Sequence, residues 1–546
     1  MTPAIPLKRD IGWPNKSSQR ESAVTSRNSA KRHPIPLFIA IGIYVLVTVA
    51  ILIASCRGTG RHLIYPLDDT YIEMAMAKNI ATHGVWGVSP YEFSSSASTP
   101  LFVLTLAATF KLFGVNEYAP LVLSWTFGLL AIWVASRMLR KRLSDAWQTL
   151  VLVALVLFTP MFVVGILGME HSLHLLLTLL FLNQIDKRDS PIWTVAAITA
   201  LMVATRYEGL FLALTGIVFL VAARKFAKAL AIAVSALVPI GAYALFSINQ
   251  GGYWLPNSVA LKGTNRIHGL DLLSRSVSLL HVTLSNISRA WHLVFLLGAL
   301  SIAAFVLRKR RRCCGLLVIV AGACCIHMAT ADVGWVFRYE DYLIASAIVI
   351  LACSFSRLRE SSRVAAIAVG CFLFCSEAFL IERSIDAAVM LPGHSLSIYS
   401  QQWQMAAFLK SYYPNARIAA NDIGAIDFVN DLHLLDLVGL ASGDVLMAKR
   451  KGRYSTDFIE QSASKRDIQI AIVYDAWFST SSKSPFRGPP LPKRWIRVRR
   501  WTIPYEDYVG DETVSFYALN PDAAGPLQTN LIQFERTMPR AVETYP

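Results

Sequence analysis

Charged residues are scarce in this chain. Of its 546 residues, 16% are charged and 54% are hydrophobic, and the mean hydropathy is +0.45. A soluble globular protein of this length would need more charge on its surface. The composition therefore predicts a polytopic α-helical membrane protein.

Acidic residues are fewer than basic residues: the chain has 36 Asp and Glu, 52 Lys and Arg and a net charge of +16. A basic balance can indicate a nucleic-acid partner. Here, however, the basic residues lie in short clusters between apolar runs, where cytoplasmic loops of membrane proteins carry them. The charge is interpreted as membrane orientation, and no nucleic-acid partner is expected.

Cysteine is present without a pattern. All eight cysteines lie within or beside apolar runs, and none follows residue 375. Neither a disulfide framework nor a zinc spacing is visible, so they are expected to be small buried apolar side chains. The stretch Ile53-Ala54-Ser55-Cys56 looks like a lipoprotein processing site, but the polar leader before it is too long for an ordinary secretory signal.

Three regions follow from the pattern of apolar runs. Residues 1–34 are basic and rich in Ser, Asn and Pro, which predicts a disordered cytoplasmic tail. Residues 35–381 form a membrane domain of about eleven predicted transmembrane helices, since ~20 apolar residues span a bilayer. These spans are 36–55, 118–136, 147–167, 171–185, 191–205, 208–223, 227–247, 291–307, 314–330, 341–356 and 363–381.

The apolar segment 101–113 is short for a span. Counting it as one would place the basic cluster Arg137–Arg142 outside and invert every later loop. An interfacial or re-entrant helix is predicted instead. With that choice, all the unusual polar motifs fall on the outer side.

Residues 382–546 change in character. A helical pattern covers 401–412, and strand-like runs follow at 417–420, 432–437, 468–474, 495–503 and 514–519. This order predicts a small extracytoplasmic α/β domain. Its runs contain no catalytic triad or phosphate loop, which favours a binding or lid role.

Asp68 and Asp69 are the first candidate site residues. They follow the first apolar segment and open a predicted amphipathic helix over 68–83, with Gly84 as its stop. One aspartate can cap a helix for ~1 kcal/mol, but a cap does not need two. A second carboxylate beside lipid is expected to bind a metal ion, to pair with a cationic group or to accept a proton from a substrate.

The other predicted outer turns supply further candidates. Glu170 with His171 could ligate a metal, orient a substrate hydroxyl, or simply cap a helix. Arg206 and Lys262 could hold an anionic phosphate, although Arg206 and Glu208 could instead neutralise each other. Arg338 is a further candidate, with snorkelling at a helix end as the favoured explanation.

The order of these motifs resembles the GT-C superfamily of membrane glycosyltransferases, and the actinobacterial arabinofuranosyltransferases in particular. Related bacterial mannosyl- and aminoarabinose-transferring enzymes are also similar. The motifs are Asp68-Asp69, Ser98-Thr99-Pro100-Leu101, Gly168-Met169-Glu170, Arg206-Tyr207-Glu208-Gly209, Leu255-Pro256-Asn257 with Lys262, Asn421-Asp422-Ile423-Gly424-Ala425-Ile426 and Asp436-Leu437-Val438-Gly439-Leu440. Two departures stand out: the family often has Arg-Pro where this chain has Arg206-Tyr207, and a Ser-rich turn at 94–98 replaces one containing Gly and Tyr.

The resemblance implies a polytopic protein of a bacterial inner (plasma) membrane, with its N-terminus in the cytoplasm. It implies transfer of a sugar from a polyprenyl phosphate to a hydroxyl of a cell-envelope glycan or glycolipid, with inversion at the anomeric carbon. Membrane lipids would surround the protein. A weakly nucleophilic hydroxyl needs a base, and a leaving phosphate needs positive charge. Asp68 would match the general base, and Arg206 or Lys262 would hold the phosphate.

A divalent cation (Mg²⁺, Mn²⁺ or Ca²⁺) is the one cofactor that the resemblance leaves open. Asp69 would ligate it or position the acceptor, with Glu170 as a second ligand and Asn257 and Arg338 among the binding residues. Two other function classes compete. A lipid or solute transporter or flippase should carry polar residues near the bilayer midplane and internal repeats, which are not evident. A non-enzymatic assembly factor is the third.

Overall fold

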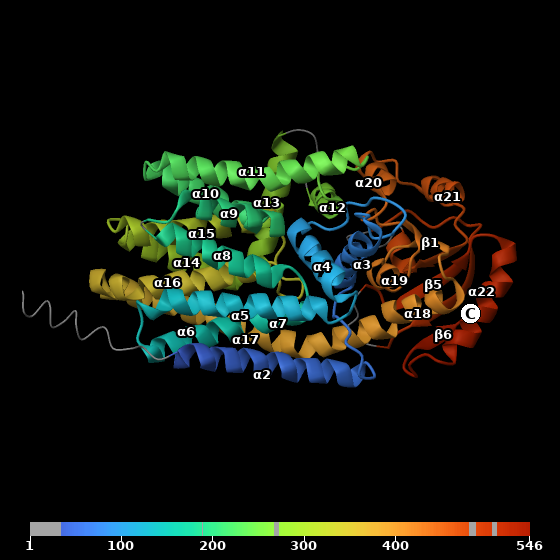
Figure 1. The fold of residues 1–546 in the computed structure, drawn as a ribbon, viewed down its shortest axis with the longest axis horizontal. Coiled ribbons are helices and arrows are strands. Elements are labelled where there is room, and N and C mark those ends of the chain that lie inside the picture. The colour runs from blue at the N-terminus through green and yellow to red at the C-terminus, as the bar shows by residue number, and fades with distance from the viewer. Residues whose placement is uncertain (1–33, 188, 267–271, 480–486, 505–509) are drawn as a thin grey trace, which may run out of the picture.

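The computed structural model describes residues 34–187, 189–266, 272–479, 487–504 and 510–546, without the side chains of 262–266, 272–275 and 311–312. The predicted disordered tail, apart from Pro34, lies outside these residues. The chain forms a long helical bundle with a small mixed domain at one end (Figure 1). The fold is therefore a polytopic helical protein with a C-terminal α/β domain, as the sequence predicts.

The bundle consists of apolar helices that account for all the predicted spans, together with one amphipathic helix, Leu272–Arg289, that no predicted span covers. They are α2 (Ile35–Gly58), α5 (Ala119–Arg140), α6 (Asp145–Phe158), α7 (Met161–Leu167), α8 (His171–Asp186), α9 (Ile192–Thr205), α10 (Gly209–Ala222), α11 (Phe226–Asn249), α13 (Leu272–Arg289), α14 (Trp291–Val306), α15 (Arg311–Thr330), α16 (Asp341–Ser361) and α17 (Arg363–Ser400).

Length and composition mark the chain as a multi-pass membrane protein. Among the described residues, six helices are long and apolar enough to cross a membrane, or up to eight if each bent pair is one span. The bent pairs are α6 with α7, at 46°, and α13 with α14, at 95°. Helices α9 and α10 have 14 residues each, or ~21 Å against a hydrocarbon core of ~30 Å. The count of about eleven therefore stays a prediction.

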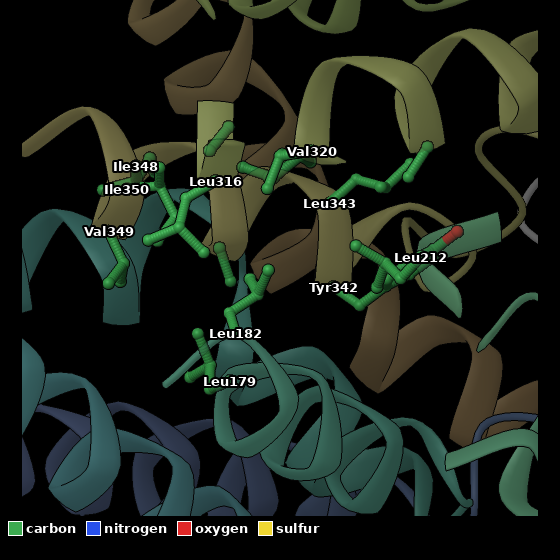
Figure 2. Packing of buried hydrophobic residues seen from close by; sticks show 14 of the residues in the cluster. Leu179, Leu182, Leu212, Leu316, Val320, Tyr342, Leu343, Ile348, Val349 and Ile350 are labelled. Carbon is green, nitrogen blue, oxygen red and sulfur yellow. The ribbon is translucent and has the colours of Figure 1, made fainter. Parts of the chain in front are cut away.

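Helix α16 lies at the centre of the bundle. Ten consecutive residues, Tyr342–Leu351, are buried, as expected for a helix that is apolar on every side. Figure 2 shows Tyr342, Leu343 and Ile348 facing side chains of α8, α10 and α15. Tight packing on all sides gives the turn before α16 a rigid support.

Two further helices, α3 (Asp68–His83) and α4 (Pro100–Phe113), lie between the bundle and the C-terminal domain (Figure 1). Helix α3 has its predicted bounds and ends at Gly84, whose φ of 69° forms the left-handed C-cap. Thr70–Ala77 are all buried, because α4 and the C-terminal domain pack against the helix.

The C-terminal domain contains one six-stranded sheet in the order β2-β1-β3-β5-β4-β6. The strands are β1 (Arg417–Ala420), β2 (His433–Asp436), β3 (Ile470–Val473), β4 (Ile496–Thr502), β5 (Thr513–Ala518) and β6 (Glu543–Tyr545). β1 pairs in parallel with β2 and β3, and the other pairs are antiparallel. The five predicted strands are all present; the short edge strand β6 was missed.

Helices complete the domain and connect it to the bundle. They are α18 (Gln402–Tyr412), α19 (Gly424–Val429), α20 (Gly443–Arg450), α21 (Thr456–Lys465) and α22 (Pro521–Glu535). Helix α17 runs without a break through the predicted domain boundary at residue 382. The bundle and the domain therefore share one helical connection.

The short helix α4 allows a test of membrane orientation. Its 14 residues are ~21 Å long, too short to cross ~30 Å of hydrocarbon. A reporter fused after residue 115 should therefore report outside, and one fused after residue 141 should report inside. The opposite pair of signals would restore 101–113 as a true span.

Candidate active site

Asp68 joins the bundle to the C-terminal domain. Its side chain is buried, and its Oδ2 and Oδ1 accept hydrogen bonds from the backbone N–H groups of Gly424 at 2.6 Å and Ala425 at 2.8 Å. These are the first two residues of α19, whose free N–H groups attract an anion. Asp68 thus caps α19, and the interpretation as a cap of its own helix is wrong, because the N-cap of α3 is Leu67, with no side-chain bond.

Lys78 binds the opposite end of the same short helix. Its Nζ donates hydrogen bonds to the carbonyl groups of Asp427, Phe428 and Asn430, at 2.8–3.1 Å. A cation at the C-terminus and an anion at the N-terminus both match the helix dipole. Helix α3 therefore holds α19 at both ends.

Glycine is required at position 424. A Cβ there would lie 2.2 Å from the carbonyl oxygen of Asp68 and 2.6 Å from its Oδ2. The backbone of α19 can approach α3 this closely only without a side chain.

A second carboxylate, that of Asp422, lies beside Asp68. Burial raises the pKa of Asp68 well above its usual range, and the neighbouring Asp422 raises it further. Asp422 Oδ2 accepts hydrogen bonds from the hydroxyl of Tyr474 at 2.8 Å and from Gln402 Nε2 at 2.9 Å. The junction between bundle and domain therefore contains a carboxyl group, that of Asp68, whose protonated form is favoured.

Asp69 faces the opposite way from Asp68. Its side chain is 48% exposed, and its Oδ2 accepts a hydrogen bond from Arg338 at 2.5 Å. Arg338 itself is buried at 2% exposure, so the snorkelling interpretation is wrong. Asp69 is the accessible carboxylate of the pair.

Arg206 gathers three of the predicted residues. Its guanidinium donates to the Glu170 carboxylate and to Glu208 at 2.6 Å, and it lies 2.8 Å from His171 Nε2. Burial raises the pKa of Glu208, but Arg206 lowers it by more, to about 2. Arg206 and Glu208 therefore do neutralise each other, with Glu170 as a second anion.

Tyr339 connects the two arginine clusters. Its ring centroid lies 5.7 Å from the Arg206 guanidinium and 5.1 Å from that of Arg338, distances typical of cation–π contacts. The turns after α7 and α9 and the turn before α16 thus converge on one aromatic ring.

Asn257 fixes a third segment to the same region. Its backbone N–H donates to the carbonyl of Ser95 at 2.7 Å, and its Nδ2 donates to the carbonyl of Leu440 at 2.9 Å. This ties α12 (Asn257–Arg266) to the Ser-rich turn and to the C-terminal domain. Lys262 lies on α12, but its side chain is outside the described part of the structure, so its role stays a prediction.

A cavity of about 320 Å³ opens beside Arg206. Its polar lining includes Ser98, Tyr207, Glu208 and Tyr339, and its apolar lining comes from Leu210, Phe211, Leu279 and Val282. Within the described residues, the hydroxyls of Tyr207 and Ser258 have no hydrogen-bond partner. A hollow that joins apolar walls to a few polar groups suits an amphiphilic ligand.

Sequence reasoning missed the residues that hold the Arg338 turn. Glu340 accepts a hydrogen bond from Arg383 at 2.7 Å and two from the Gly334 N–H, at 3.1 and 3.2 Å. Trp335–Phe337, which lie between Gly334 and Glu340, have positive φ angles of 34–55°. Residues other than glycine rarely adopt such angles. Buried ionic contacts thus hold a strained turn in place. The sequence signals that could have revealed this contact are two charged residues beside or within apolar segments, Glu340 and Arg383.

The predicted metal ligands do not fit a divalent cation. Asp69 is paired with Arg338 and Glu170 with Arg206, so each carboxylate already contacts a cationic group. The described part of the chain contains no cluster of three or more His, Cys, Asp or Glu that could hold a metal. A cation would have to displace a guanidinium, and the mechanism below uses none.

Solved structures with a similar fold include two states of one bacterial protein. ArnT from Cupriavidus metallidurans, in the apo state, has a TM-score of 0.53 and 13% identity over 89% of this chain and 99% of its own. The same protein bound to undecaprenyl phosphate gives a TM-score of 0.52 at the same identity and coverage.

An archaeal protein gives a similar match. The Archaeoglobus fulgidus oligosaccharyltransferase complex with zinc and sulfate has a TM-score of 0.52 and 14% identity over 85% of this chain and 72% of its own.

Residues 394–517 match a family model described as a domain of unknown function (DUF8728). No curated protein matches the chain. The chain therefore shares the fold of these solved structures.

The close approach at Gly424 predicts a large effect of a small change. Gly424→Ala should lower the melting temperature of the purified protein, because its methyl group cannot fit beside Asp68. The matched control is Gly525→Ala in α22, where a Cβ would meet nothing within 4 Å, and it should leave stability unchanged or slightly higher. Equal melting temperatures for the two variants would contradict the close contact.

The carboxylate pair predicts a pH dependence of stability. The pKa of Asp68 is raised in the folded protein, so its contribution to stability is present at low pH and is lost as pH rises through that raised pKa. Asp422→Asn should reduce this loss. The asparagine oxygen can still accept both bonds because both fall on Oδ2.

Thermal unfolding of both proteins at a series of pH values, from acidic to alkaline, would measure the difference in stability between them. The advantage of Asp422→Asn over wild type should grow with pH. A constant difference across the range would show that the two carboxylates do not interact.

Proposed function

We propose that the protein is a membrane glycosyltransferase that moves a sugar from a polyprenyl phosphate to an acceptor hydroxyl on the outer face of a bacterial inner membrane. The observation that carries the proposal is the half-exposed Asp69 carboxylate beside the buried Arg338. A base and an anion-binding group at one point are what transfer from a phosphate leaving group needs. The ArnT structure with bound undecaprenyl phosphate supports this donor class.

Asp69 replaces Asp68 as the proposed general base. Both oxygens of Asp68 are occupied by backbone N–H groups under the C-terminal domain, which leaves no position for a substrate hydroxyl. Asp69 is accessible, and Asp68, which precedes it, is held in place by its hydrogen bonds to α19. Asp68 then acts as a positioning residue, because it sets the orientation of the first turn of α3.

The reaction is a single displacement. The acceptor oxygen attacks the anomeric carbon, its proton passes to Asp69, and the bond from that carbon to the phosphate oxygen breaks. One displacement inverts the configuration at the anomeric carbon. As the phosphate binds Arg338, the guanidinium divides its contacts between the phosphate and Asp69, which makes the carboxylate a better proton acceptor.

The cavity beside Arg206 is the proposed place of the donor lipid. Its apolar walls on α10, α13 and α15 suit the first isoprene units, and Tyr339, which lines it, also lies against Arg338, where the phosphate binds. Arg206 is held in position by Glu170 and Glu208. The sugar that the resemblance favours is arabinofuranose, and the acceptor is a cell-envelope glycan or glycolipid.

The two aspartates should respond differently to the same substitution. Asp69→Asn should fold normally and lower transfer by ~10²–10⁴-fold, the usual contribution of a general base. Asp68→Asn should lower the melting temperature, because an NH₂ group cannot accept the second N–H bond and leaves it unsatisfied at a cost of ~1–3 kcal/mol.

Transfer from polyprenyl-phosphate arabinofuranose, and in turn from the mannose analogue, would be measured beside thermal unfolding. Asp522→Asn, an exposed aspartate in the first turn of α22, is the control and should match wild type in both assays. Wild-type transfer by Asp69→Asn would exclude the base assignment. Lipid translocation without transfer by the wild-type protein would indicate a flippase instead.

A further inference from the structure

A second hollow lies on the other side of the Asn257 segment. Its volume is about 760 Å³, and it lies between the turn after α3, the segment before α12 and the C-terminal domain. Its lining includes Glu92–Ser95, Gln250–Tyr253, Asn257, Ala441–Asp444, Lys465 and Arg466. No part of the proposed mechanism uses this groove.

The lining of the groove is polar and charged. Arg466 pairs with Asp444 at 2.9 and 3.1 Å. Burial raises the pKa of Glu92, which Arg466 lowers and Asp444 raises, so the three charges lie together. Lys465 also lines the groove, so two acidic and two basic side chains balance each other. The groove is therefore rich in donors and acceptors without a strong field for an ion.

Aromatic rings lie beside these polar groups. Phe93 packs edge-on against Phe246 with centroids 5.7 Å apart, and Tyr253 lies under the Arg450 guanidinium at 4.8 Å. Both rings are partly exposed and line the groove. An aromatic ring can stack on the C–H face of a sugar, and polar side chains beside it can hydrogen-bond the sugar's hydroxyls. The groove offers both kinds of group.

The groove and the Arg206 cavity share a wall that is a few residues thick. Ser94 and Ser95 line the groove, and Ser98 lines the cavity; Asn257 lines the groove, and Ser258 lines the cavity. The backbone bond from Asn257 to Ser95 holds this wall together. Ligands in the two hollows would therefore approach each other across it.

We propose that this groove binds the acceptor as a hydrophilic glycan chain, with the C-terminal domain supplying one of its walls. This inference rests on the proposed function, since it assigns the second substrate of that reaction. A lipid tail is a poor occupant, because it would take the charges of Glu92, Asp444 and Arg466 out of water without replacing the hydrogen bonds that water gives them.

The test compares two arginines of the C-terminal domain. Arg466→Ala removes a donor from the groove, whereas Arg494→Ala removes a similar ion pair, to Glu460 at 2.6 Å, outside the lining. Arg466→Ala should raise the acceptor KM about tenfold, the effect of losing about one charged hydrogen bond, with kcat and donor KM unchanged. Arg494→Ala should match wild type.

A second variant fills the groove instead of emptying it. A side chain added at Gly443 would enter open space, so Gly443→Trp should block the glycan without disturbing the fold. It should raise the acceptor KM at least as much as Arg466→Ala. Thermal unfolding of each variant shows that the protein is intact.

A binding assay separates this inference from the proposed function. Short arabinofuranose and mannose oligosaccharides would be added to the full-length protein without donor, and binding read by saturation-transfer NMR. Binding lost in Arg466→Ala and Gly443→Trp but kept in Arg494→Ala supports the groove even if no transfer is found. Glycan binding or an acceptor KM that neither groove variant changes would overturn it.

Discussion

The contact between α3 and α19 is the interaction on which the rest of the site depends. Asp68 bonds the N-terminus of α19, and Lys78, on the same helix, bonds its C-terminus. Each contact matches the helix dipole, and together they fix the position and direction of the C-terminal domain. Because Asp69 follows Asp68 directly, the same contact also fixes the accessible carboxylate of this pair.

Paired arginines organise the remaining charges. Arg206 neutralises Glu170 and Glu208, and Arg338 bonds Asp69. Buried ion pairs of this kind add little net stability, but they hold the guanidinium groups in fixed positions. An anionic leaving group can therefore bind a donor that is already oriented, which is the usual source of electrostatic catalysis.

The sequence was sufficient to predict the architecture and the site motifs, but not their contacts. Hydropathy and basic clusters located every apolar helix of the bundle, and alternation located five of six strands. The roles of adjacent residues were less accessible: Asp68 and Asp69 look alike in sequence, and their opposite directions depend on α19, more than 350 residues away. For the same reason, the charged turn at Arg338 was interpreted as snorkelling although it is buried against α3.

The central claim is that Asp68 holds the C-terminal domain on the bundle through the N–H groups of α19. Hydrogen–deuterium exchange of the peptide containing Gly424 and Ala425 tests it directly, in the full chain in detergent. We expect slow exchange in wild type and faster exchange in Asp68→Ala, with the strands of the sheet equally protected in both. Unchanged protection of the Gly424 and Ala425 amides in Asp68→Ala would contradict it.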